Sequence, residues 1–282
     1  MTSPYAIGAA SSLLWGSADF LGGVAARRAP APLVACFSGV GALALLFVAM
    51  PLMPGAASGA DLLWGAAAGG CGAAGASLMY RSLARGPMSL ASPVFSLVGL
   101  CVPVLFGLAA GERPSVLAWV GVALAGLAIP LLSMTGEGPG HYPREHVRRT
   151  LVVALAAGLV IGWFLVFVAR IGGSAGLMPL VVARGAAIGI LAGWYLARGQ
   201  SLLPPAPART SALAAGVLDS AANVAFLIAV HRAPLVLISA LVSLAPAATV
   251  LAARLTLGEC WTMAQALGLL VALAAGMCIS VG

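Results

Sequence analysis

Charged side chains are scarce in this chain of 282 residues. They make up 7% of the sequence, whereas soluble domains carry about 25%, and lysine is missing altogether. Hydrophobic residues account for 62% of the chain, and the mean hydropathy is +1.09. This composition excludes a soluble globular domain and indicates an integral membrane protein.

Motifs of enzymatic chemistry are missing as well. The sequence contains no HExxH zinc motif, no phosphate-binding loop ending in GKS or GKT, and no GxSxG nucleophile elbow. Its five cysteines show no CxxC spacing, which argues against a metal site or a disulfide framework. We therefore expect neither an enzyme nor a bound cofactor or metal. The net charge of +7 does not indicate a nucleic-acid partner, because the arginines stand singly at the ends of apolar segments.

What the chain does contain is a series of apolar segments of membrane length. Crossing a bilayer takes roughly 20 residues per helix, and ten segments meet that requirement. The predicted fold is an all-α polytopic membrane protein with ten transmembrane helices. The segments cover residues 5–25, 31–53, 62–83, 88–110, 115–133, 150–170, 176–197, 210–230, 234–256 and 261–281.

The two halves of the chain repeat each other. Matching residues recur 147 positions apart without a gap, which indicates an internal duplication. The polar stretch 134–149 divides the chain into a first five-helix repeat, 1–133, and a second, 150–282. Because five is odd, the second repeat enters the membrane inverted, and this predicts a transporter with a central cavity between the repeats. The matching pairs include Arg85/Arg232, Pro87/Pro234, Ser92/Ser239, Ser96/Ser243, Gly111/Gly258 and Glu112/Glu259.

The polar stretch 134–149 is rich in glycine, proline and charge, so we expect a flexible connection and not a helix there. The loops after the odd-numbered helices hold ten arginines, and the loops on the opposite side of the membrane hold three. The positive-inside rule then places both termini outside the cytoplasm.

The first segment carries Asp19 and lacks a basic start, which predicts a first membrane helix and not a cleaved signal peptide. We expect a multi-pass protein of the cell inner (plasma) membrane.

Three features resemble one known family. They are the motif Trp15-Gly-Ser-Ala-Asp-Phe20, the Pro-then-Ser pattern that opens helices four and nine, and the Gly-Glu pairs before helices five and ten. Over essentially the whole chain, the sequence resembles the ten-helix EamA-type branch of the drug/metabolite transporter superfamily. The resemblance implies transport of a small metabolite, mostly outward and often coupled to protons.

The sequence departs from this family pattern in three places. The loop after the second helix has no basic residue, although relatives commonly place positive charge there. The second helix has Phe37 where many family members carry an arginine, while the seventh helix keeps Arg184. The third helix offers Met79 and Tyr80 where some amino-acid exporters place further aromatic or histidine groups, so an aromatic amino acid is not implied.

Three ionisable residues stand well inside predicted spans: Asp19, Arg184 and Asp219. Such residues are costly in a membrane and usually pair or face a water-filled cavity. Asn223 lies one turn after Asp219 on the same helical face, so both side chains are expected to point toward one substrate group. The alternative is that Asp219 only neutralises Arg184.

Asp19 shares a helical face with Trp15. A carboxylate in an apolar cavity exchanges protons more readily near neutral pH than one in water. We therefore hypothesise that Asp19 or Asp219 couples transport to protons. The alternative for Asp19 is an ion pair with Arg27 or Arg28 near the membrane surface.

Aromatic and hydroxyl side chains complete the predicted substrate site. Trp15 and Trp163 fall at similar places in the first and sixth helices and favour a cavity or core location. Tyr80 closes the third helix and faces either the cavity or the membrane interface. Ser96 and Ser243 are a repeated pair in the fourth and ninth helices.

Prolines and glutamates mark the ends and kinks of these helices. Pro103 and Pro246 lie inside the fourth and ninth helices, where a proline frees a backbone carbonyl. Such kinks serve either as hinges or only as packing features. Glu112 and Glu259 each precede a helix, where a carboxylate caps free N–H groups.

Taken together, the sequence predicts a secondary active transporter that works by alternating access, without a cofactor and with protons as the coupling ion. We expect a proton-coupled exporter of amino acids or related compounds, present as a monomer or homodimer in the lipid bilayer. An importer of a sugar or similar nutrient, and a membrane scaffold that transports nothing, are the alternatives.

Overall fold

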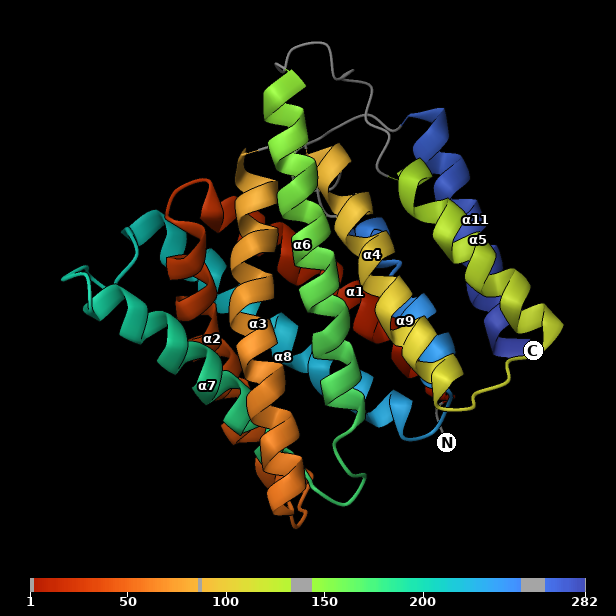
Figure 1. Cartoon of the computed structure of the whole chain (residues 1–282), viewed down its shortest axis with the longest axis horizontal. Helices are drawn as coiled ribbons and strands as arrows, with labels where there is room; N and C mark the ends of the chain where they lie inside the picture. The colour runs from red at the N-terminus through yellow and green to blue at the C-terminus, as the bar shows by residue number, and fades with distance from the viewer. Residues whose placement is uncertain (1–2, 86–87, 133–143, 250–261, 282) are drawn as a thin grey trace.

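The computed structural model describes residues 3–85, 88–132, 144–249 and 262–281, and over this part of the chain it is helical with no strand (Figure 1). The helices follow the predicted segments closely, so the predicted fold class is confirmed. Their bounds are α1 (Pro4–Ala26), α2 (Ala31–Ala49), η1 (Met50–Leu52), α3 (Gly59–Arg85), α4 (Met88–Ala109), α5 (Val116–Leu132), α6 (Arg144–Ala169), α7 (Met178–Leu196), α8 (Ala206–Val230), α9 (Leu235–Val242) and α11 (Met263–Val281).

The described helices suit a bilayer in length and surface. Five of them are each long and apolar enough to cross a membrane, and four further stretches are apolar but shorter. Large apolar side chains such as Phe47, Leu105, Leu159 and Leu270 are more than half exposed on the outer surface of the bundle. In water such a surface would drive aggregation, whereas in a bilayer it meets lipid.

Each helix of the first repeat has a counterpart in the second, and the counterparts make equivalent contacts. The pairs of counterparts are α1/α6, α2/α7, α3/α8, α4/α9 and α5/α11. α3 packs along α6 and α7, and α8 packs in the same way along α1 and α2. The pairs α2–α7, α4–α9 and α5–α11 join a helix to its own counterpart, and Figure 1 shows α5 beside α11 at one edge of the bundle. The fold is therefore two inverted five-helix repeats related by a pseudo-twofold axis.

Glycine lets these helices approach closely, as the Gly/Ala-rich segments predict. A Cβ on Gly65 or Gly69 of α3 would collide with the main chain of α7, and a Cβ on Gly216 of α8 would collide with the main-chain oxygen of Ser38. Without Cβ atoms the backbones gain van der Waals contact, which is the main attraction between helices in lipid.

The polar stretch between the repeats is partly helical, contrary to the prediction. Residues 133–143 lie outside the described part of the chain, but α6 already begins at Arg144. Glu145 in its first turn accepts hydrogen bonds from Arg148 and Arg149, and these bonds lower the pKa of the Glu145 carboxyl. The pairs at i+3 and i+4, with an acidic residue at the helix start, favour a helix that glycine and proline counts alone do not reveal.

Glu112 caps a helix, but not the one predicted. α4 ends at Ala109, and the φ of +95° at Gly111 allows the Glu112 N–H to donate to the Gly107 carbonyl and the Gly111 N–H to the Leu108 carbonyl. The Glu112 carboxylate then accepts hydrogen bonds from the N–H groups of Leu235 (2.8 Å) and Val236 (2.9 Å), at the start of α9 in the other repeat.

The start of α5, where Glu112 was predicted to act, is capped by another residue. The Ser115 hydroxyl accepts a hydrogen bond from the Ala118 N–H at 3.0 Å. Glu259, the repeated counterpart of Glu112, lies outside the described residues.

The ninth span is broken, whereas its counterpart α4 is continuous. α9 ends at Val242, a turn occupies Ser243 and Leu244, and helical structure resumes over 245–249. Pro246 has no N–H to donate to the Val242 carbonyl, which accounts for a break at this point. Pro103 of α4 and Pro130 of α5, by contrast, lie inside continuous helices.

Candidate functional site

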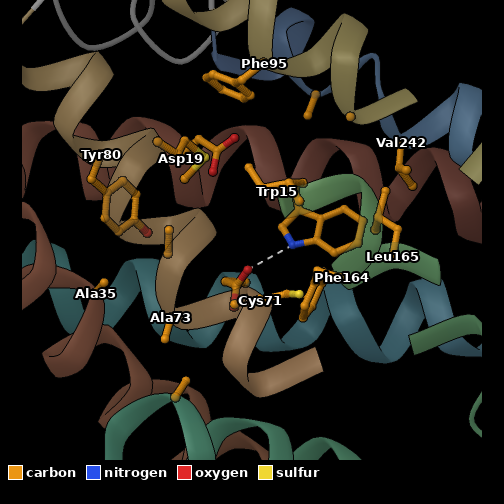
Figure 2. Close-up of a pocket in the computed structure, with 18 of the residues that line it drawn as sticks. Trp15, Asp19, Ala35, Cys71, Ala73, Tyr80, Phe95, Phe164, Leu165 and Val242 are labelled. Atoms are coloured by element: carbon orange, nitrogen blue, oxygen red, sulfur yellow. Dashed lines mark hydrogen bonds between the residues drawn. The ribbon is translucent and has the colours of Figure 1, made fainter. Parts of the chain in front are cut away.

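A cavity lies between the two repeats and is lined by residues of both (Figure 2). It offers about 140 Å³ to the centres of water-sized molecules, and its wall is mostly apolar. Four helices of each repeat contribute, α1 to α4 and α6 to α9. Cavities of this kind, with apolar walls and a few polar groups, are typical binding sites for small molecules.

Asp219 of α8 is held from two sides. The Trp15 indole donates a hydrogen bond of 2.9 Å to Oδ1, drawn as the dashed line in Figure 2, and the Arg184 guanidinium forms an ion pair with Oδ2. The ion pair between Asp219 and Arg184, which the sequence analysis gave as an alternative to a functional role, is therefore present. Because the pair also lines the cavity, the contact does not remove it from the site.

Asp19 lies on the cavity wall one turn from Trp15, as Figure 2 shows. Within the described part of the chain, its carboxyl has no hydrogen bond or ion pair, although it repels the Asp219 carboxylate electrostatically. The proposed alternative partner Arg28 donates instead to the main-chain oxygen of Pro207 at 3.3 Å. Asp19 is thus a carboxyl group that faces the cavity.

Tyr80 and two of the predicted serines also lie in this wall. The Tyr80 side chain is 4% exposed and stands on the cavity side of α3, so it is not an interfacial anchor. A Cβ on Gly22 would overlap its ring, which explains a glycine at that point of α1. Ser96 of α4 and Ser243, at the break after α9, line the cavity from opposite repeats.

Trp163 does not line the cavity, which corrects the prediction. Its side chain is 46% exposed on the outside of α6, where it packs against Phe167. Gly162 packs against α4 in the same way as Gly16 packs against the 245–249 helix, so these two glycines are equivalent in the two repeats. When Gly16 is aligned with Gly162, the residue that corresponds to Trp15 is Ile161. A residue two positions after Ile161 is rotated by about 200° around the helix, so Trp163 faces the lipid side.

Asn223 also fails to reach the cavity. Its side-chain N–H donates to the main-chain oxygen of Asp219 at 2.7 Å, and the side chain is 1% exposed. This bond to the carbonyl four residues earlier is a common alternative for polar side chains inside helices. Asn223 therefore positions α8 and does not share a substrate group with the Asp219 carboxylate.

Several wall residues escape detection from the sequence. Ser38 of α2, Phe95 of α4 and Phe164 of α6 are ordinary in composition, and only their placement brings them to the cavity. The repeated pair Ser92/Ser239 did point to Ser239, whose hydroxyl is fully buried and has no hydrogen-bond partner among the described residues. No group of three or more His, Cys, Asp or Glu side chains in the described ranges is placed to hold a metal ion.

Comparison with known proteins places the chain in a family. Residues 2–134 match the model of the EamA-like transporter family. By this match the first half of the chain belongs to the EamA-like transporter family of the drug/metabolite transporter superfamily. The resemblance of the sequence to this family is thereby confirmed.

Sixteen chains of solved structures also match this EamA-like transporter. One of them, a crystal structure described without a function, is 18% identical, covers 99% of this chain and 96% of its own, and superposes with a TM-score of 0.76. At this identity the match shows the fold alone. No curated protein sequence matches the chain.

Proposed function

We propose that this EamA-like transporter is a proton-coupled secondary transporter of the plasma membrane that exports amino acids or related compounds by alternating access. The observation that carries the proposal is the cavity between the two repeats, with a carboxyl group, Asp19, that no described residue pairs. A buried ionisable group facing a cavity in a membrane protein is a functional site by default.

Of the two carboxylates, Asp19 suits proton exchange better. Both oxygens of Asp219 are engaged, one by Trp15 and one by Arg184, so protonation would break an ion pair and strand a buried guanidinium. Asp19 can gain or lose a proton without breaking such a bond. The other ionisable side chains described on this wall are Asp219, Arg184, Tyr80 and Cys71.

Alternating access requires the two repeats to part first on one face of the membrane and then on the other. On the face where α3 begins, the repeats are joined by hydrogen bonds from the Ala56 N–H to Ser174 (3.0 Å) and from the Gly172 N–H to Asp61 (2.7 Å). The Glu112 cap on α9 joins them on the same face. Among the described residues these are the hydrogen bonds that join the repeats on this face, and their small number supports opening at modest cost.

The test is counterflow in proteoliposomes loaded with pooled amino acids, sugars and nucleosides, with and without a pH gradient. We expect exchange of amino acids or related compounds, and Asp19→Asn should lose the acceleration of this exchange by the pH gradient. Asp219→Asn should lose exchange altogether, because it frees Arg184 inside the cavity. Glu145→Gln, the same chemical change at an exposed site, is the control.

Three results would contradict the proposal. If none of the pools is exchanged in either direction, the result would favour the membrane scaffold. Full pH-driven flux in the Asp19→Asn, Asp219→Asn double variant would exclude both carboxylates as the coupling site. Exchange confined to the sugar pool, with inward accumulation in cells, would favour the importer.

A further inference from the structure

The charges on the cavity wall do not balance. Asp19 and Asp219 contribute two carboxylates, and Arg184 is the one cation among the described residues that line the cavity. Because Arg184 is already paired with Asp219, the remaining charge of the ionised site is the negative charge of Asp19. A ligand that complements this wall brings a positive charge.

Uncharged oxygen groups on the same cavity wall also favour a positively charged ligand. The Ser239 hydroxyl is fully buried on the cavity wall and has no described hydrogen-bond partner. α9 ends on that wall, at Val242 and Ser243, and the carbonyl end of a helix carries a partial negative charge. The break at Pro246 leaves the Val242 carbonyl without its helical N–H donor. These groups can accept hydrogen bonds from an ammonium group.

A carboxylate on the ligand would find no such complement. To bind it, Arg184 would have to leave Asp219, which would then stand unpaired next to Asp19. Three further arginines, Arg27, Arg28 and Arg81, line a separate depression where α1 ends. The site therefore discriminates against zwitterions as well as against anions.

The rest of the wall is suited to an apolar body. Trp15, Tyr80, Phe95 and Phe164 present aromatic rings to the cavity (Figure 2), and such rings attract a cation as well as apolar groups. The volume of about 140 Å³ is close to that of an engineered cavity of roughly 150 Å³ that holds benzene. A ligand of one ring or a short branched chain fits this space.

We propose that the transported molecule is a small organic amine without a carboxylate, whose ammonium group binds at Asp19 and Ser239 and whose apolar body lies against the aromatic wall. This inference rests on the proposed transport function and narrows its substrate class. Amine and proton compete for the Asp19 carboxyl, so the wall that exchanges protons also selects the substrate.

The experiment compares matched ligands on the purified full chain. 2-Phenylethylamine, phenylalanine and 2-phenylethanol share one ring and differ in charge, and 3-methylbutylamine with leucine repeats the comparison for a branched chain. Binding is measured by calorimetry in detergent, and flux by counterflow in proteoliposomes. We expect each amine to bind at least about tenfold more tightly than its amino acid, as a charge-assisted hydrogen bond allows.

Variants locate the effect. Asp19→Asn should remove the preference for the amines, while Glu145→Gln, an exposed acid on α6, should keep it. The wild-type comparison needs no variant, so the inference can be tested even if Asp19→Asn does not fold. Equal or tighter binding of the amino acids would overturn the inference.

The inference and the proposed function can fail separately. Proton-coupled counterflow of phenylalanine or leucine with no amine preference would overturn the amine inference and leave the proposed transport function standing. Tight amine binding that depends on Asp19, without flux of any ligand, would support the inference about the site and contradict transport.

Discussion

The side chain of Trp15 does two things at once in the cavity. Its ring forms part of the wall and packs against Phe226 at 5.6 Å between centroids, while its N–H donates to Asp219. A buried carboxylate that loses a donor keeps the cost of desolvation without the compensating bond. Trp15 therefore holds Asp219 in the position where Arg184 pairs with it.

Replacing Trp15 with phenylalanine separates these two roles. Trp15→Phe keeps an aromatic ring but removes the N–H, and a hydrogen bond to a charged group contributes about 1.5–3 kcal/mol. We expect transport in proteoliposomes to fall roughly tenfold with the protein still folded in detergent. Trp194→Phe, on the outer surface beside Arg198, should transport as the wild type does. Equal losses in both variants would contradict the assigned role.

For single residues, the sequence shows which charged side chains belong to the site but not which way an uncharged side chain points. Asp19, Arg184 and Asp219 stand out because ionisable residues are rare inside apolar spans, and all three line the cavity. Trp163 illustrates the limit. Both the cavity side and the lipid side of these helices are mostly apolar, so no periodic pattern in the sequence distinguishes one side from the other. An error of two positions in aligning the repeats was enough to choose the wrong face.

The fourth helix of the second repeat, α9, connects the cavity wall to the opposite repeat. α9 begins at Leu235 under the Glu112 carboxylate and ends at the cavity wall, eight residues later. Its first turn is thus anchored by the opposite repeat, while the turn at Ser243 and Leu244 separates its last turn from the helical stretch 245–249. This combination fixes one end of the element and leaves the other able to move.

Removal of the anchor should destabilise the whole bundle. Glu112→Ala strands the N–H groups of Leu235 and Val236, and loss of an N-terminal cap costs about 0.5–2 kcal/mol. We expect a lower thermal midpoint in detergent, with partial recovery in Glu112→Gln, which keeps one acceptor oxygen. Glu145→Ala removes only exposed pairs within α6, which contribute little. An equal shift for Glu145→Ala would contradict a special role for Glu112.

The break after α9 should matter for turnover more than for stability. Pro246→Ala restores an N–H that can donate to Val242 and close the helix. We expect a protein at least as stable as the wild type but several-fold slower in counterflow, since a continuous helix of this kind resists bending. Pro130→Ala, inside continuous α5, is the matched control. Unchanged turnover in Pro246→Ala would leave the break a packing feature only.

Element positions follow from the sequence far better than element ends. The bilayer dictates segment length, and apolar runs report it directly, so nine of the ten predicted spans each coincide with one helix, whereas the ninth is broken after Val242. The break after Val242 and the Glu112 cap depend on where a distant chain segment lies. The start of α6 depends on the local pairs of Glu145, which weigh more than the glycine and proline content of the stretch before it.

The whole molecule is symmetric in backbone packing and asymmetric in charge. Aligning Gly16 with Gly162 places Leu165 opposite Asp19, and the 147-residue repeat places Gly72 opposite Asp219 and Phe37 opposite Arg184. The Asp19 carboxyl therefore belongs to one repeat and the ion pair to the other. Motion of one repeat against the other changes the distance between them, which gives binding a way to bias the motion.

If transport proceeds by such motion, the face where α3 begins must open in every cycle. Ala56 and Ser174 are exposed, belong to different repeats and are joined by a main-chain hydrogen bond of 3.0 Å. Ala56→Cys with Ser174→Cys, in a cysteine-free background shown to transport, should form a disulfide on oxidation. We expect oxidation to abolish flux, reduction to restore it, and either single variant to be unaffected, because a bond across the repeats holds this face closed. Substrate binding in detergent should survive the crosslink, since the cavity wall is untouched. Undiminished flux through the oxidised double variant would mean that the two repeats do not part at this face during transport.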